Sequence, residues 1–217
     1  MKPNWSCILF DLDGTIADSA PGITASLAFM FEKLGRPTPT ADELRAWVGP
    51  PILDSFRDLA GMDQVESAQA LSIYRQHYLA SGSESPIYPG IAALLRRIHK
   101  AGIPLALATS KPEFAASLIL DHGNITQYFR VISGSSIDEI RSAKQDIISE
   151  ALTRFRMIGA DFSAPVMVGD RFYDVEGAAA NDMPAILVNW GYGEAGEADG
   201  AIATAKNAEQ LRELLLP

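Results

Sequence analysis

The amino-acid sequence predicts an α/β protein with a three-layer core, in which helices cover both faces of a parallel sheet, and with an all-helical insertion. Two observations predict this architecture. From residue 88 onward, short apolar runs alternate with segments of helical periodicity, a pattern typical of strands joined by crossover helices. Between residues 18 and 87 the apolar spacing is helical, and no convincing strand interrupts it. We therefore expect a core domain of residues 1–17 and 88–217 and a helical domain of residues 18–87.

The composition limits the kinds of partner. The net charge is −9, and no cluster of Lys and Arg supplies the basic surface that a nucleic acid polymer or an anionic membrane requires. No apolar segment approaches membrane-spanning length, and Asp11 interrupts the first apolar run before it could serve as a signal peptide. The single cysteine, Cys7, cannot form an internal disulfide. We expect a cytoplasmic location.

The first strand is predicted at residues 7–10, where the apolar run Cys-Ile-Leu-Phe leads directly into Asp11-Leu12-Asp13-Gly14-Thr15. In an α/β sheet, a buried strand followed by a glycine turn delivers side chains to the edge where ligands bind. Neighbouring carboxylates are unfavourable there unless a cation or a division of catalytic roles compensates. A calcium-binding EF-hand loop does not fit, because Ile16 and Gly22 occupy the places of its obligatory Gly and Glu. The alternative interpretation, a solvated turn whose Asp residues simply cap the following helix, remains at this point.

The inserted helices begin after this turn. Asp18-Ser19-Ala20-Pro21 predicts a helix start with a capping side chain and a proline near the first position, and Gly35 ends that helix after Leu34. The segment Gly49-Pro50-Pro51 breaks the helical pattern, and the turn-rich segment of residues 81–86 leads out of it. These breaks delimit the helical domain.

The core elements follow in chain order. Helices are predicted at residues 91–101, 114–121, 144–155, about 170–180, and from the cap Asn207 to 215; strands are predicted at residues 103–108, 131–132, 165–168 and 185–189, with a weak edge candidate at 200–204. This order requires a parallel sheet with helices as crossovers.

Polar side chains follow two further predicted strands and open one crossover helix. Thr109-Ser110-Lys111-Pro112 follows one strand, where a hydroxyl could donate to a phosphate oxygen, and Asp170 and Asp174 follow another. Lys144 begins a helix, where the helix dipole disfavours a positive charge, so we expect an acidic partner for it. With the two acids after the first strand, four carboxylates face one ammonium group, and a hard divalent cation such as Mg²⁺ would offset the surplus negative charge.

Each of these features alone has a simpler interpretation. Thr109 could cap the next helix, Lys144 could be solvated, and Asp170 with Asp174 could be a pair favoured by the helix dipole. Together they would require independent coincidences at one sheet edge, which favours a functional site. The three histidines lie on separate predicted helices without metal-ligand spacing, and we interpret them as structural or surface residues.

The order of the motifs resembles the haloacid dehalogenase (HAD) superfamily of phosphohydrolases: Asp-x-Asp-Gly-Thr, a strand-ending Thr, a Lys, and Gly-Asp-x-x-x-Asp. The resemblance covers nearly the whole chain. The segments most similar to the phosphoglycolate phosphatase branch are residues 8–19, 109–112, 144–148 and 168–178, and the sequence Trp190-Gly191-Tyr192-Gly193. The resemblance implies a Rossmann-like core with a helical cap of the C1 type, inserted after the first motif, where this chain has residues 18–87.

The resemblance implies a role for each acidic motif residue. Asp11 would be the nucleophile that forms an aspartyl-phosphate, and Asp13 the acid that protonates the leaving alcohol and then the base that activates water. Mg²⁺ would be bound by Asp11, the backbone carbonyl of Asp13 and Asp170. Asp174 would complete the metal site by holding the water shell or Lys144.

The remaining motif residues would hold the phosphoryl group. Thr109 would donate a hydrogen bond to it, and Lys144 would balance the charge of nucleophile and phosphate. Backbone N–H groups near Leu12 and Ser110 are further phosphate donors, because loop and helix-start amides suit anions.

The resemblance also implies that the helical cap closes over the leaving group. The loop around Gly49, Pro50 and Leu53 would exclude water from the reaction. Arg171 and Lys111 are candidates for substrate contact, although each could equally be a charge at the rim.

The expected function is Mg²⁺-dependent hydrolysis of a small phosphorylated metabolite, with phosphoglycolate as the first candidate. A nucleoside monophosphate is the second, and a phosphotransferase of the β-phosphoglucomutase type is the third; a catalytically silent binding protein is the least favoured. Dehalogenating members lack the acid that Asp13 supplies, and phosphonate-cleaving members need a cap lysine, whereas residues 44–56 contain Arg45 and no lysine. The resemblance leaves open whether the chain is a monomer or a homodimer.

Overall fold

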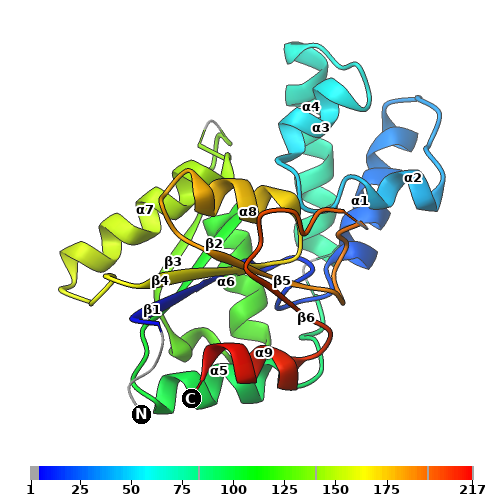
Figure 1. Ribbon diagram of the computed structural model, residues 1–217. Coiled ribbons are helices and arrows are strands. Elements are labelled where there is room, and N and C mark those ends of the chain that lie inside the picture. Colours follow the sequence, from blue (N-terminus) through cyan, green and yellow to red (C-terminus); the bar gives the residue numbers. More distant parts are fainter. Residues whose placement is uncertain (1–4, 83, 140, 195, 217) are drawn as a thin grey trace.

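The computed structural model describes residues 5–82, 84–139, 141–194 and 196–216, and within them the core is a six-stranded sheet (Figure 1). The strand order is β3-β2-β1-β4-β5-β6, and each neighbouring pair is parallel. The strands are β1 (Cys7–Phe10), β2 (Leu105–Pro112), β3 (Phe129–Ser135), β4 (Pro165–Gly169), β5 (Ala185–Val188) and β6 (Ala203–Ala205). The predicted α/β fold with a parallel sheet is therefore confirmed.

Helices cover both faces of the sheet (Figure 1). One face carries α5 (Ile91–Lys100), α6 (Glu113–His122) and α9 (Ala208–Leu215), and the other carries α7 (Lys144–Met157) and α8 (Phe172–Ala179). In β1, Ile8 and Phe10 join the hydrophobic cluster of the first face, whereas Cys7 and Leu9 join that of the second. Because both faces are covered, the strand is a continuous apolar run.

The helices between β1 and α5 form a lobe that stands beside the sheet, at the upper right of Figure 1. Its elements are α1 (Ala20–Lys33), α2 (Ala41–Arg45), α3 (Ile52–Asp58), α4 (Gln64–His77) and a π-helical turn, η1 (Tyr78–Gly82). These elements share a hydrophobic cluster of their own, whose fully buried members include Leu27, Val48 and Phe56. The chain enters and leaves the lobe at one place, where the N–H of Asp18 donates to the carbonyl of Pro86 (2.9 Å).

The connections around β1 create a crevice at one sheet edge. β1 lies between β2 and β4; the chain reaches β2 through the lobe and α5, but it reaches β4 through α7 on the opposite face. Ligands of open α/β sheets bind at such a switch point, outside the carboxyl ends of the strands. Asp11 directly follows β1 and Asp170 directly follows β4, so both acids lie at this edge.

The predicted cap of the first inserted helix is wrong. Helix α1 begins at Ala20, as the proline that follows favours, but the side chain of Ser19 makes no capping hydrogen bond. Asp18 does not cap it either, because its Oδ1 accepts a hydrogen bond from the hydroxyl of Tyr192 (2.8 Å). The hydroxyl of Tyr192, far along the chain, contacts Asp18 and accepts from the N–H of Ala20, in place of a local capping hydrogen bond.

Two strands, β2 and β3, extend several residues beyond their predicted ends. β2 continues to Pro112, so that Thr109 and Ser110 lie within the strand instead of following it. β3 covers residues 129–135, because it pairs with β2 as far as Pro112 opposite Ser135, after a shift in register. By contrast, the predicted cap of the last helix is confirmed: Asn207 accepts from the N–H groups of the two residues at 209 and 210 (3.1 and 3.0 Å).

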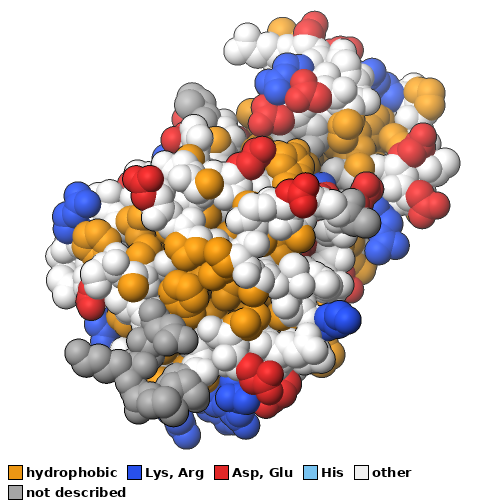
Figure 2. All heavy atoms as spheres, in the orientation of Figure 1, with side chains coloured by type: hydrophobic (Ala, Val, Ile, Leu, Met, Phe, Trp, Pro, Cys, Tyr) orange, Lys and Arg blue, Asp and Glu red, His pale blue; other side chains and the backbone are white. Residues whose placement is uncertain are grey.

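The surface is mixed in character. Figure 2 shows Lys and Arg side chains scattered over the face that it draws, not gathered into one patch. Among the described helices, none combines the length and the apolar character that crossing a membrane needs. The cytoplasmic location stays a prediction.

Candidate active site

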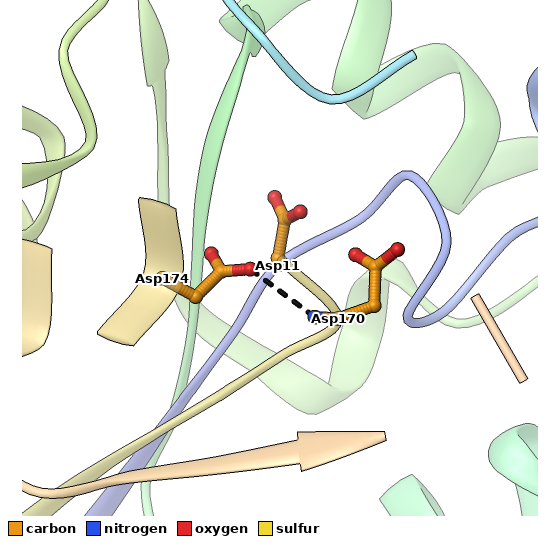
Figure 3. Close-up of side chains that lie close together, drawn as sticks. All are labelled: Asp11, Asp170 and Asp174. Atoms are coloured by element: carbon orange, nitrogen blue, oxygen red, sulfur yellow. Dashed lines mark hydrogen bonds between the residues drawn. The ribbon is translucent and has the colours of Figure 1, made fainter. Parts of the chain in front are cut away.

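Three buried carboxylates meet at the carboxyl edge of the sheet (Figure 3). Asp11 comes from the end of β1, Asp170 from the end of β4, and Asp174 from the first turn of α8, and one carboxylate oxygen of each lies within 4.8 Å of those of the other two. Oδ2 of Asp174 accepts hydrogen bonds from the backbone N–H groups of Asp170 and Arg171 (both 3.1 Å). The four-residue spacing thus fixes the turn after β4 and places both carboxylates in the crevice.

Lys144 joins this acidic cluster. It is the first residue of α7, its side chain is 6 % exposed, and its Nζ lies 2.7 Å from Oδ1 of Asp11 and 2.8 Å from Oδ1 of Asp174. The ammonium group also donates to the carbonyl of Ala108 (3.1 Å). The structure therefore shows why a cation stands at a helix start: two carboxylates offset the unfavourable dipole.

A second buried ion pair lies beside the cluster. Nζ of Lys111, from β2, is 3.0 Å from Oδ2 of Asp13, and both side chains are buried. The sequence predicted for Lys111 either a contact with the substrate or a charge at the rim of the site. In the structure, Lys111 is buried and paired with Asp13. The other carboxylate oxygen, Oδ1 of Asp13, is buried and accepts no hydrogen bond from the described residues.

The charges of these residues fit a divalent cation. When ionised, the four carboxylates carry four negative charges and the two lysines carry two positive ones, which leaves two negative charges in a buried site. Carboxylate oxygens are the ligands that Mg²⁺ prefers. Asp11, Asp170 and Asp174 each offer an oxygen to the same space, and Asp174 also holds Lys144 and the backbone of the turn after β4.

Asp170 is itself held in place. Its Oδ2 accepts from the N–H of Tyr192 (2.7 Å) and its Oδ1 from the hydroxyl of Thr15 (3.3 Å). Gly14 has a φ of +81°, and a Cβ atom there would lie 2.1 Å from the Asp170 carboxylate, so the motif needs glycine.

Burial governs the ionisation of the cluster. Burial raises the pKa of Asp11 to about 6, although the neighbouring ammonium of Lys144 acts in the opposite direction. Burial, together with Asp174 and Asp11, raises the pKa of Asp170 well above its ordinary value. Burial alone would lower the pKa of Lys144, but Asp11 and Asp174 raise it. A bound cation would favour the ionised acids.

This electrostatic arrangement predicts an unusual pH dependence for the metal-free protein. An unfolded Asp has a pKa near 3.9 and folded Asp11 one of about 6, so the folded state binds the proton more tightly. Lowering the pH from 7 to 5 in a chelator should therefore stabilise the protein, on the order of 1 kcal/mol from Asp11. Urea unfolding at both pH values measures this gain, and Asp11→Asn should reduce it; an equal gain in the variant would contradict the assignment.

The predicted phosphate contacts surround the cluster. Thr109 is buried, and its hydroxyl accepts from the N–H of Lys111 (3.3 Å). Leu12 is buried between the two acids of the first motif, and Ser110, the next residue after Thr109, lines two pockets. All three lie at the sheet edge that carries Asp11.

Arg171 is placed differently from the acids. Its Nε lies 2.8 Å from Oε2 of Glu197, and its Nη1 donates to the carbonyl of Val48 in the helical lobe (2.8 Å). Gly49, with a φ of +112°, packs so closely against Arg171 that a Cβ atom would lie 3.3 Å from its side chain. Arg171 therefore links the core to the lobe. No sequence pattern indicated that Glu197 would be its partner.

A pocket lies between the core and the lobe, and we call it the aromatic pocket. The core contributes Asp13, Ser110, Lys111, Phe114 and Glu139, and the lobe contributes Trp47, Gly49, Pro50, Tyr74, Arg75 and Tyr78, among others. Gly49 and Pro50, predicted as cap-loop residues, therefore face the same pocket as Asp13. The aromatic residues of the lobe were not predicted as site residues, because their helical spacing is equally typical of core packing.

Fold and site together define a Rossmann-like α/β enzyme with a buried acidic cluster at its switch point. The chain belongs to the haloacid dehalogenase-like hydrolase family, whose model matches residues 8–188. The predicted family is therefore confirmed. The predicted enzyme class, a phosphoric monoester hydrolase of this family, is confirmed as well.

Similar proteins carry several names. Tyrosine-protein kinase PtkA of Mycobacterium tuberculosis is 39% identical over 213 residues, which cover 96% of this chain and 72% of PtkA. A 5'-nucleotidase of Pseudomonas aeruginosa is 35% identical (88% of this chain, 85% of the relative), and a phosphoglycolate phosphatase of Pseudomonas syringae is 33% identical (85% and 70%). The crystal structure of a predicted phosphatase from Clostridium acetobutylicum superposes with a TM-score of 0.90, at 36% identity over 97% of each chain.

Proposed function

We propose that the protein is an Mg²⁺-dependent phosphatase that hydrolyses a small phosphomonoester through an aspartyl-phosphate on Asp11. The observation that carries this proposal is the position of the Lys144 ammonium, 2.7 Å from Asp11 and beside Asp170 and Asp174. A carboxylate held next to a fixed cation is oriented for attack, and the same cation can neutralise an incoming phosphoryl oxygen.

The reaction needs two displacements at phosphorus. In the first, an Asp11 oxygen forms a bond to phosphorus while the ester P–O bond breaks, and the departing oxygen takes a proton from Asp13. In the second, Asp13 takes a proton from water, the water oxygen bonds to phosphorus, and the Asp11–phosphorus bond breaks to release inorganic phosphate. Asp11 and Asp13 are both regenerated, and Lys144 and Thr109 hold the phosphoryl oxygens throughout.

The acidic cluster would hold the cofactor. Asp11 and Asp170 would bind Mg²⁺ through carboxylate oxygens, the backbone carbonyl of Asp13 would add a ligand, and Asp174 would keep Lys144 and the turn after β4 in place. When bound, Mg²⁺ would supply charge neutralisation to the phosphoryl group.

The helical lobe would act as the cap of this site. Its own hydrophobic cluster and its single point of chain entry and exit support an independent unit of residues 18–87 on a core of residues 1–17 and 88–217. The loop at Gly49 and Pro50 lines the aromatic pocket and would exclude water from it.

Release of phosphate from 4-nitrophenyl phosphate tests the proposal. We expect release with Mg²⁺ and none with a chelator. Equal background release in both conditions would favour a catalytically silent binding protein. A mutase would instead release little phosphate from sugar phosphates and would interconvert their isomers.

Phosphoglycolate and nucleoside monophosphates are the candidate substrates. Relatives named for each support them, with 33% and 35% identity. A screen of phosphorylated metabolites with the purified protein would rank the two directly.

A second candidate function comes from the likeness to PtkA, which extends over 96% of this chain. The phosphoryl group on Asp11 could then pass to a tyrosine hydroxyl instead of water, with a nucleoside triphosphate as the donor. Incubation with γ-labelled ATP and a tyrosine-containing peptide tests this candidate: label on tyrosine would support it, and label found only in free phosphate would reject it.

Asp170 provides a test of the metal site that does not depend on activity. Mg²⁺ should raise the melting temperature of the protein, because a ligand that binds only the folded state stabilises it. Asp170→Asn should increase the Mg²⁺ concentration needed for half of this shift at least about tenfold. The exposed Asp199→Asn is the matched control and should leave it unchanged. An unaltered Mg²⁺ response in Asp170→Asn would remove Asp170 from the metal site.

A further inference from the structure

The aromatic pocket lies on the Asp13 side of the active site. Asp13 and Lys111 line it, whereas Lys144 lines a different pocket on the other side of Ser110. In the proposed reaction, Asp13 gives its proton to the departing oxygen. The group that leaves with that oxygen must therefore occupy the aromatic pocket.

The charged residues that line this pocket are already paired with one another. Lys111 is paired with Asp13 (3.0 Å), and Nη2 of Arg75 is paired with Oε1 of Glu139 (2.8 Å). Lys111, Asp13 and Glu139 are buried. When ionised, these four side chains carry no net charge, so a carboxylate on the leaving group would lose its hydration and give the pocket a net negative charge, which is costly in a buried site. The pocket therefore disfavours a second anionic group on the substrate.

Aromatic rings form much of the pocket wall. Tyr74 and Tyr78 stack with ring centroids 5.8 Å apart at 18°, and Nζ of Lys111 lies 4.7 Å from the centroid of the Tyr78 ring. The Lys111 ammonium thus holds the Tyr78 ring by a cation–π contact. Trp47 contributes a third ring, and the partly exposed Phe114 a fourth. Flat apolar walls of this kind bind flat ligands by burial and by ring packing.

Three polar atoms of the residues that line the pocket have no hydrogen-bond partner among the described residues. They are the hydroxyl of Tyr78, Nε of Arg75 and Oδ1 of Asp13, and all three are buried. Tyr78 as a whole is only 4 % exposed. Buried polar groups are nearly always satisfied in folded proteins, so three unsatisfied groups in one pocket point to polar atoms of a ligand. Asp13 would meet the departing oxygen, which leaves the Tyr78 hydroxyl and the Nε–H of Arg75 for further polar atoms of the leaving group.

We infer that the aromatic pocket selects an uncharged, ring-bearing alcohol as the leaving group, with Tyr78 as the residue that determines this specificity. The inference rests on the proposed phosphatase function and narrows its substrates. It places phosphate esters of ring-bearing alcohols, nucleosides included, above phosphoglycolate, whose leaving group carries a carboxylate.

Three alkyl phosphates distinguish the effect of a charge on the leaving group from the effect of a ring on it. With Mg²⁺ and the full chain, kcat/KM for benzyl phosphate should exceed that for 2-phosphoglycolate at least about tenfold. Glycerol 1-phosphate, whose leaving group is uncharged but has no ring, should lie between them. Equal or better hydrolysis of 2-phosphoglycolate would overturn the inference. This comparison needs no variant. Absence of phosphate release from these substrates and from 4-nitrophenyl phosphate would instead refute the proposed function itself.

Variants of Tyr78 test the named residue. Tyr78→Ala should lower the ratio of kcat/KM for benzyl phosphate to that for glycerol 1-phosphate about tenfold, because the stacked wall is lost. Tyr78→Phe should keep this ratio within about twofold, but it should lower kcat/KM for a nucleoside monophosphate about fivefold, because only the hydroxyl is lost. Gln76→Ala, exposed on α4 and outside the pocket, is the control and should change neither value. A proportional loss with all substrates in Tyr78→Ala would show a merely structural role.

Discussion

Asp11→Asn should abolish Mg²⁺-dependent phosphate release, with a loss on the order of 10³-fold or more, because the amide cannot form the aspartyl-phosphate. The fold should survive the change. Burial already raises the pKa of Asp11 to about 6, which means that the site disfavours its charge, and Lys144 keeps its second partner, Asp174. Release from 4-nitrophenyl phosphate measures the activity, and thermal unfolding in a chelator measures the stability.

The exposed Asp161→Asn is a matched control for this substitution, since it makes the same chemical change on the surface. It should keep full activity. If Asp11→Asn retained more than a few per cent of the activity while Asp161→Asn behaved as expected, Asp11 would not be the nucleophile. If both variants lost activity together, a general loss of folded protein would be the explanation.

Lys144→Met should have the largest effect on stability. The substitution leaves the buried carboxylates of Asp11 and Asp174 without their cation, and removing one partner of a buried ion pair typically costs about 3–5 kcal/mol. Phosphate release should also fall strongly, because no ammonium group remains beside the nucleophile. Urea unfolding in a chelator measures the loss of stability, and added Mg²⁺ should restore part of it by replacing the missing positive charge.

Lys100→Met is the control, because Lys100 is exposed at the end of α5 and should cost less than about 1 kcal/mol. A Lys144→Met protein that unfolds at the same urea concentration as the Lys100 variant would show that the ion pairs contribute little. A Lys144→Met protein with normal phosphate release would remove Lys144 from the reaction.

The sequence was most informative where one local rule decides the geometry. Asp11 and Asp170 follow buried strands of a parallel sheet, and the carboxyl ends of such strands meet at one edge, so their proximity could be predicted. Lys144 could be predicted to seek acids, because a cation at a helix start is otherwise unfavourable. The helical character of residues 18–87 followed from periodicity alone.

Contacts between distant segments could not be predicted in this way. The pairs Lys111–Asp13 and Arg75–Glu139 join residues 98 and 64 positions apart, and no local spacing indicates either of them. The continuation of β2 through Thr109 was missed because the polar run that begins at Thr109 was expected to follow the strand, whereas pairing with β3 extends the strand. The capping role of Ser19 was wrong for a related reason, since Tyr192 fixes this entry from the far end of the chain.

The N–H of Asp18 and the carbonyl of Pro86 are only 2.9 Å apart, although 67 residues separate them in the chain. A loop of a few residues could span that gap, so a chain without the intervening helices could keep the strand order of the core. The two positions thus form one junction at which the helical insertion could be exchanged as a single segment, with the acids at the sheet edge unchanged.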